Sequence, residues 1–187
     1  YIDAVGCLLN YTRRRGGDHG LNVNAFNGSA WLHGKMMWME DDPRTHFHTQ
    51  MESGRTASMA ETLTVLKRSF GYSLTRNQGV WWRMFDSAWY HHEEIMRTFQ
   101  QVQQAASASV DVDQSSLSEV ALFFDLPSVH SIAYDPGNSF ISSHTWETYG
   151  NASRMGAPFD AYLLEDIGDP GMPDYKLYVF MNAWQVE

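Results

Sequence analysis

The chain has 187 residues, which is enough for one ordinary domain or for two small or incomplete ones. Lys and Arg number 13 and Asp and Glu number 22, so the formal net charge is −9. A chain this acidic is a poor candidate for binding nucleic acid or an anionic membrane surface, because both need a basic patch. Hydrophobic residues at 43% and charged residues at 19% are typical of a globular protein.

The cysteine content and the apolar runs exclude further classes. The single Cys7 excludes an internal disulfide and a cysteine-based zinc site, and it favours a cytoplasmic location. No apolar run approaches the roughly 20 residues of a membrane-spanning helix, and no signal-peptide pattern is found. Because the sequence begins at Tyr1 and ends at Glu187 just after a strand-like run, we expect a piece of a longer protein.

The first 30 residues are rich in Gly and Asn and predict loop structure, since both residue types favour turns. The apolar run 36–39 then predicts a short buried strand. That strand leads directly into Glu40, and Pro43 indicates a turn. A carboxylate at the carboxyl end of an apolar strand is a common position for a functional group.

A helix and a second strand are expected next. Ser58 and Glu61 have the spacing of a capping box, and apolar residues then recur every three or four positions. We expect this helix to end at Gly71. Residues 79–85 predict another strand, so the order strand, helix, strand favours a parallel sheet. A further helix is expected over about 92–104.

The second half of the chain predicts another α/β segment. Small and polar residues over 105–118 indicate a linker. Apolar runs predict strands at 120–124, 159–164 and 176–183, and a helix at about 142–155. We expect the first and second segments to form separate sheets. The predicted domains are therefore residues 1–104 and 119–187, joined by the linker 105–118.

Glu40 is the main candidate for chemistry. Neighbouring acids and an arginine are the means by which proteins tune a carboxylate, and here they are Asp41, Asp42 and Arg44. A nucleophilic carboxylate must stay ionised and be held rigidly, which the end of a strand provides. The alternative is a solvated acidic turn that caps the next element.

Two histidines offer a weaker hypothesis. His46 and His48 lie on one side of an extended segment, a spacing that a metal ion can use, and Asp42 or Glu52 could add a carboxylate. The alternative is coincidence, because the chain has 8 His and no third ligand is fixed by its spacing. We therefore assign neither a metal site nor a cofactor, and keep a metal-dependent hydrolase only as a third hypothesis.

The adjacent Trp81 and Trp82 lie in a predicted strand, so their rings should point to opposite faces of the sheet. One ring can pack in the core while the other lines a pocket, where an indole can stack on the apolar face of a sugar. The alternative is that both rings are buried in packing.

Several stretches of sequence resemble the β-galactosidase-like glycoside hydrolases of family 42 type. In the first half these are LHGK at 32–35, WMEDDPRT at 38–45 and TRNQGVWW at 75–82. They are similar to the last part of the catalytic barrel in that family. In the second half, RMGAPFDAYLL at 154–164 and PDYKLYVFMNA at 173–183 resemble the start of the Rossmann-like domain that follows the barrel.

The resemblance implies the last strands of a (β/α)8 TIM barrel, followed by a partial open Rossmann-like or flavodoxin-like α/β domain. It implies that Glu40 is the nucleophile at the end of the seventh barrel strand. Trp81 and Trp82 would belong to the eighth strand, with Arg44 supporting Glu40. The residues expected to bind the substrate are Trp81, Trp82, Arg44 and His19.

The implied activity is that of a retaining β-glycosidase, which hydrolyses terminal β-linked sugars by double displacement. The implied partners are a carbohydrate substrate and, in the full-length protein, two further copies in a homotrimer. The family's acid/base Glu lies upstream of the stretch that corresponds to Tyr1, so the isolated chain should be inactive. The alternative is a non-catalytic sugar-binding or assembly protein on the same fold, in which that upstream Glu would be missing.

Overall fold

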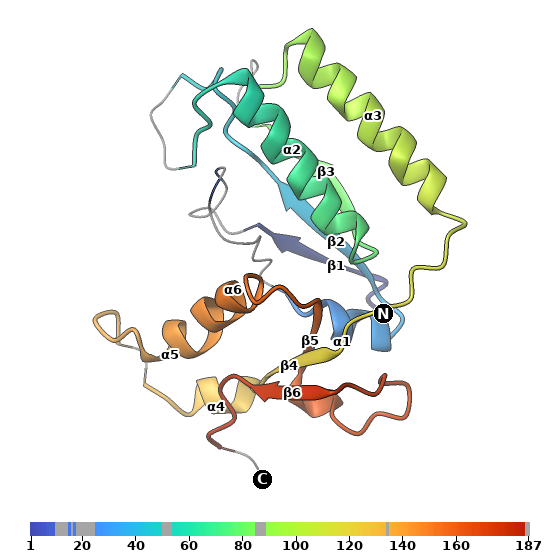
Figure 1. Cartoon of the computed structure of the whole chain (residues 1–187). Helices are drawn as coiled ribbons and strands as arrows, with labels where there is room; N and C mark the ends of the chain where they lie inside the picture. Colours follow the sequence, from blue (N-terminus) through green and yellow to red (C-terminus); the bar gives the residue numbers. More distant parts are fainter. Residues whose placement is uncertain are drawn as a thin grey trace. The chain divides into compact units, whose positions relative to one another are not determined.

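The computed structural model describes residues 1–9, 15, 17, 25–49, 54–84, 89–133 and 135–185. Packing divides the chain into two compact units (Figure 1). The first-sheet unit comprises Ala4–Asn24 and Met36–Ser115, and the second-sheet unit comprises Tyr1–Asp3, Ala25–Lys35 and Ser116–Glu187. Each unit holds one sheet of three parallel strands, so the protein is of the mixed α/β class. No described helix is both long and apolar enough to cross a membrane.

The first-sheet unit has its strands side by side in chain order, β1-β2-β3. Its elements are β1 (Ala4–Leu8), β2 (Met36–Asp41), α2 (Met59–Leu74), β3 (Gly79–Trp82) and α3 (Glu93–Ser109). The parallel strands predicted at 36–39 and 79–85 are confirmed as β2 and β3. The loop predicted for the first 30 residues is wrong for β1, which is stabilised by its pairing with β2, and for residues 27–30, which begin a helix.

The predicted helix start at Ser58 is confirmed in detail. The Ser58 hydroxyl accepts a hydrogen bond from the amide of Glu61 at 3.2 Å. The Glu61 carboxylate accepts from the amide of Ala57 at 2.6 Å, one residue before the expected partner. The predicted end at Gly71 is wrong, because α2 continues to Leu74. The left-handed turn falls instead on Asn77, with φ of 48°, since Asn also tolerates that conformation.

The helices α2 and α3 cover one face of the first sheet, which we call the helix-covered face (Figure 1). Met39 of β2 meets α2 through the hydroxyl of Ser73, and the ring of Trp82 packs on Phe99 of α3 at 4.5 Å. Side chains of the other parity lie on the opposite, open face. The open face carries Leu8, Met36, Trp38, Glu40 and Trp81.

The second-sheet unit has the strand order β5-β4-β6, again all parallel. Its strands and helices are α1 (Asn27–Leu32), β4 (Val120–Phe124), α4 (Leu126–His130), α5 (Phe140–Ser142), a π-helical stretch (Ser143–Glu147), α6 (Thr148–Ala152), β5 (Phe159–Leu163), a 3-10 turn (Leu164–Asp166) and β6 (Leu177–Phe180). The three strands predicted here are confirmed, and so is their separation from the first sheet. α3 continues to Ser109, inside the segment predicted as a linker.

α1 precedes β2 in the sequence but packs against β5 of the second-sheet unit. The hydroxyl of Ser29 accepts a hydrogen bond from the amide of Leu163 at 2.7 Å. Gly28 permits this close approach, because a Cβ there would lie 2.5 Å from the ring of Tyr162 and 2.8 Å from the carbonyl oxygen of Ala161. Contact between helix and strand at this point therefore requires glycine.

We expect Gly28→Ala to lower the free energy of unfolding of the second-sheet unit by about 1–3 kcal/mol, the usual cost of overpacking a core. The backbone carbonyl of Ala161 cannot move aside as a flexible side chain could. Urea denaturation gives the measurement. The matched control is Gly71→Ala within α2, where an added Cβ would have no other atom within 4 Å. This variant is expected to raise the free energy of unfolding by about 0.4–1 kcal/mol. Equal responses of the two variants would contradict the packing argument.

Candidate active site

Glu40 lies at the carboxyl end of β2 on the open face and is only 6% exposed. Trp38 precedes it by two positions on the same face, and Trp81 is its register partner on β3. The two indole rings meet edge to face, with centroids 5.4 Å apart. Trp38 is 43% exposed, so one indole of the pair remains accessible to solvent. A carboxylate and an aromatic pair therefore share one end of this face.

The charge partner of Glu40 is Arg83. Its Nη1 lies 3.1 Å from Oε1 and 3.4 Å from Oε2 of the glutamate. Two further bonds hold the Arg83 backbone, because its amide donates to the carbonyl of Asp41 at 2.9 Å and its carbonyl accepts from the hydroxyl of Tyr90 at 3.0 Å. The guanidinium thus sits beside a buried carboxylate on a fixed backbone.

Arg44, the expected support of Glu40, contacts Asp42 instead. Its Nη1 donates to Oδ2 of Asp42 at 3.2 Å, and its guanidinium lies over the ring of Trp89 at 5.8 Å. A role for Arg44 toward Glu40 stays a prediction. Sequence reasoning missed Arg83, whose only signal was its position immediately after the strand that pairs with β2.

The acidic segment after Glu40 is buried. Asp41 and Asp42 are 1% and 0% exposed, and Thr45 is 0% exposed with its hydroxyl donating to the carbonyl of Trp89 at 2.6 Å. The alternative of a solvated acidic turn is therefore wrong. Burying several carboxylates is costly, so their positions are a fixed part of the structure.

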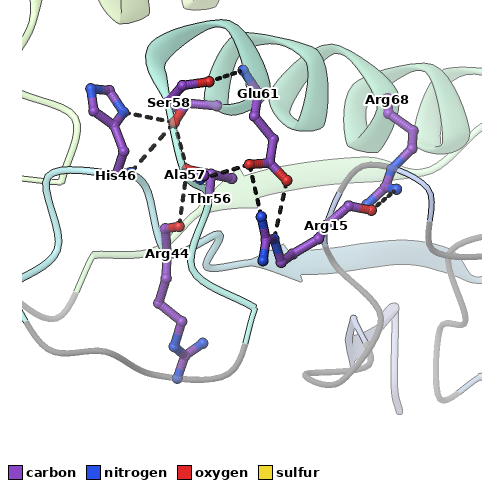
Figure 2. Close-up of polar contacts among 9 residues, drawn as sticks. Arg15, Arg44, His46, Thr56, Ala57, Ser58, Glu61 and Arg68 are labelled. Atoms are coloured by element: carbon purple, nitrogen blue, oxygen red, sulfur yellow. Dashed lines mark hydrogen bonds and ion pairs between the residues drawn. The ribbon is translucent and has the colours of Figure 1, made fainter.

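Hydrogen bonds attach the segment that follows Asp42 to the start of α2, as Figure 2 shows. The carbonyl of Arg44 accepts from the amide of Thr56 at 2.9 Å and from its hydroxyl at 3.4 Å. Nδ1 of His46 lies 2.9 Å from the hydroxyl of Thr62. These contacts fix the backbone that leaves the carboxyl end of β2.

The capping residue Glu61 also forms an ion pair (Figure 2). Its two carboxylate oxygens accept from Nε and Nη2 of Arg15 at 3.1 and 3.2 Å. The carbonyl of Arg15 in turn accepts from Nη1 of Arg68 at 2.8 Å. One glutamate therefore caps α2 and holds Arg15, which is distant in sequence, next to it.

Three of the four residues considered for a metal site have other contacts in the part of the chain that the structure describes. Among the described residues, no three His, Cys, Asp or Glu side chains form a group that could hold a metal ion. His46 bonds to Thr62, whereas the His48 ring packs edge-on against Trp89 at 4.7 Å. Asp42 pairs with Arg44. The fourth residue considered, Glu52, lies outside the described residues.

Trp81 and Trp82 point to opposite faces, as predicted. Trp81 lies on the open face near Glu40, and Trp82 packs into the cluster beneath α2 and α3. Trp38 was missed, although its two-residue spacing from Glu40 within a strand places both on one face. The remaining candidate, His19, lies outside the described residues.

Cys7 is no competitor to Glu40 as a nucleophile. It lies on the helix-covered face and is 6% exposed. Burial raises the pKa of its thiol to about 11, so the thiol is protonated at neutral pH.

No family model, no curated protein and no solved structure matches the chain. The resemblance to family 42 glycoside hydrolases therefore depends on the quoted stretches of sequence alone.

Replacing Arg83 should expose the cost of the buried carboxylate. We expect Arg83→Met to lower the free energy of unfolding by about 1–3 kcal/mol at pH 7, because Glu40 is left without its charged partner. Combining it with Glu40→Gln should recover part of that loss. The control is Arg97→Met, which breaks an exposed pair with Glu93 and should cost at most about 0.5 kcal/mol. Indistinguishable urea midpoints for the two single variants would be the contrary result.

His46 should make stability depend on pH. Burial, assisted by the positive charges of Arg55 and His92, lowers its pKa below the ordinary value of 6.5. The unfolded chain thus takes up a proton at higher pH than the folded protein does. The stabilising contribution is present above pH 6.5 and is lost as the pH falls through the folded-state value.

His46→Asn keeps a polar group near Thr62 but cannot titrate. We expect its urea midpoint to fall less steeply than that of the wild type as the pH drops from about 7 to about 5, with parallel curves above pH 7. Parallel curves over the whole range would show that His46 does not contribute.

Proposed function

We propose that the first-sheet unit is part of a retaining β-glycosidase of the β-galactosidase-like type, with Glu40 as its nucleophile. The observation that carries this proposal is the position of Glu40. It is a buried carboxylate at the carboxyl end of a parallel strand, beside Trp38 and Trp81. Active sites of parallel barrels are built at that end of the strands.

The strand order supports a barrel section. β1, β2 and β3 follow one another in chain order, and α2 and α3 both lie on the same face. A doubly wound sheet instead reverses its strand order and places helices on both faces. In a closed barrel the open face would line the interior, where further strands would cover Met36 and Trp38, now 49% and 43% exposed.

The chemistry follows from the neighbours of Glu40. In the double displacement, its carboxylate attacks the anomeric carbon as the bond to the leaving-group oxygen breaks, and the acid/base carboxyl protonates that oxygen. Water, deprotonated by the same acid/base group, then attacks the glycosyl-enzyme intermediate and releases Glu40. Arg83 keeps the carboxylate in place through Nη1, at 3.1 and 3.4 Å from its oxygens. The indoles of Trp38 and Trp81 provide an apolar wall for the sugar ring. The acid/base carboxyl is expected from a part of the barrel upstream of this chain.

We further propose that the second-sheet unit corresponds to the Rossmann-like domain and assembles the full-length protein as a homotrimer. Its edge strand β6 has exposed apolar side chains, with Leu177 51% and Tyr178 39% exposed. Edge strands of this kind favour association with another chain. We also propose that the full-length protein is located in the cytoplasm.

A second candidate function is sugar binding without catalysis. It is favoured by Trp38, because an accessible indole beside Trp81 can hold a sugar without any reaction at Glu40. The two functions differ in whether the complete protein hydrolyses aryl β-glycosides.

Glu40→Gln in the complete enzyme should reduce turnover of an aryl β-galactoside by on the order of 10³-fold or more, because it removes the attacking charge. Sugar binding should survive, and azide should partly rescue Glu40→Gly by attacking in its place. The matched control is Glu93→Gln, which removes an exposed carboxylate on α3 and should leave turnover unchanged. If Glu40→Gln keeps more than about a tenth of the turnover, the loss is under roughly 1.4 kcal/mol and Glu40 is structural. A wild type that binds sugar but hydrolyses nothing would favour the second candidate.

A further inference from the structure

The second-sheet unit contains a cavity of about 590 Å³. That volume falls within the roughly 300–1,000 Å³ typical of small-molecule sites. The cavity is lined by Phe124, Asp125, Leu126, Pro127, Leu163, Leu164, Glu165, Ile167, Phe180, Ala183 and Gln185. All of these residues belong to one unit, which is separate from the unit of Glu40.

The cavity lies where a parallel sheet offers a binding crevice. Phe124, Leu163 and Phe180 are the last residues of β4, β5 and β6, and all three line it. β4 is the central strand, so the chain continues to β5 on one side and then crosses to β6 on the other. Ligands of open α/β sheets bind at the carboxyl edge where the connections diverge in this way.

One wall of the cavity is held in place by a buried network of hydrogen bonds. The side-chain amide of Asn182 accepts from the amide of Asp125 and donates to its carbonyl, both at 2.7 Å. The Ser128 hydroxyl accepts from the amides of Trp184 and Gln185 at 3.2 and 2.9 Å. Asn182 and Ser128 are 1% and 0% exposed. A wall fixed in this way loses little entropy when a ligand binds.

The charged side chains that line the cavity are all acidic. Eight of its residues are apolar, and the polar ones are Asp125, Glu165 and Gln185. None of the described residues that line the cavity is Lys, Arg or His. The Asp125 carboxylate accepts a hydrogen bond from the amide of Ser128 at 2.8 Å and so caps the amino end of α4. An anionic ligand would meet two carboxylates there without a compensating cation.

We propose that this cavity binds a small organic cation with an apolar ring, in the manner of an aromatic amine. The ring packs between the apolar ends of the strands, with Phe124 and Phe180 as its aromatic neighbours. The ammonium group pairs with the carboxylates of Asp125 and Glu165. Leu126, Ile167 and Phe180, which are 46%, 46% and 50% exposed, supply apolar surface that the ligand would cover. This site does not depend on the proposal for Glu40.

The test compares two probes of similar shape and opposite charge, 2-phenylethylammonium and 3-phenylpropionate, titrated into the 187-residue chain at pH 7. Binding is followed by amide chemical shifts in NMR spectra. We expect the ammonium probe to bind at least about tenfold more tightly than the carboxylate probe, with shifts centred on residues 124–127 and 163–167.

Two nearly isosteric variants test the assignment. Asp125→Asn keeps an N-cap residue for α4, and Glu165→Gln changes an exposed side chain, so both should fold. Each variant should lower the affinity for the ammonium probe by about three- to tenfold. The control is Glu147→Gln, an exposed carboxylate of the same unit that does not line the cavity, and it should leave binding unchanged.

Equal affinity for the two probes, or equal effects of all three variants, would overturn the proposal. It would also be overturned if light scattering showed self-association and neither probe bound, since a second copy would then occupy this surface.

Discussion

Parallel pairing of strands is the constraint on which both units depend. Every connection between parallel strands must return from one end of the sheet to the other, so all carboxyl ends gather at a single edge. In the first sheet that edge holds Glu40 and Arg83, and in the second it holds the cavity beside Asp125. Both candidate sites therefore follow from one topological rule, although they belong to separate units.

The two sheets use their faces differently. In the first, Met37 and Met39 are almost completely buried on the helix-covered face, whereas Trp38 on the open face is 43% exposed. In the second, apolar clusters lie on both faces, so β4 is buried along its whole length. A parallel sheet is normally covered on both faces. The uncovered face of the first sheet departs from this pattern, and the proposed barrel section would account for it.

Electrostatics separates the two sites. Glu40 is a buried carboxylate whose position is fixed by a guanidinium 3.1 Å away. Asp125 and Glu165 line a cavity in which none of the described residues is basic. The same residue type thus serves as a nucleophile in one proposal and as a counter-charge for a cation in the other. The two sites differ because a neighbouring strand end places Arg83 beside Glu40, whereas no described basic residue lines the cavity of Asp125 and Glu165.

The sequence by itself determined the elements whose signals are local. Apolar runs predicted β2 through β6, and Ser58 with Glu61 predicted the start of α2. The two-residue repeat of a strand predicted that Trp81 and Trp82 lie on opposite faces of the sheet. Only the tertiary structure decided the pairing of β1, the packing of α1 on β5, and the ion pair between Arg83 and Glu40. These features join residues far apart in the chain, and their energies come from hydrogen bonds and packing across strands, which leave no periodic pattern in the sequence.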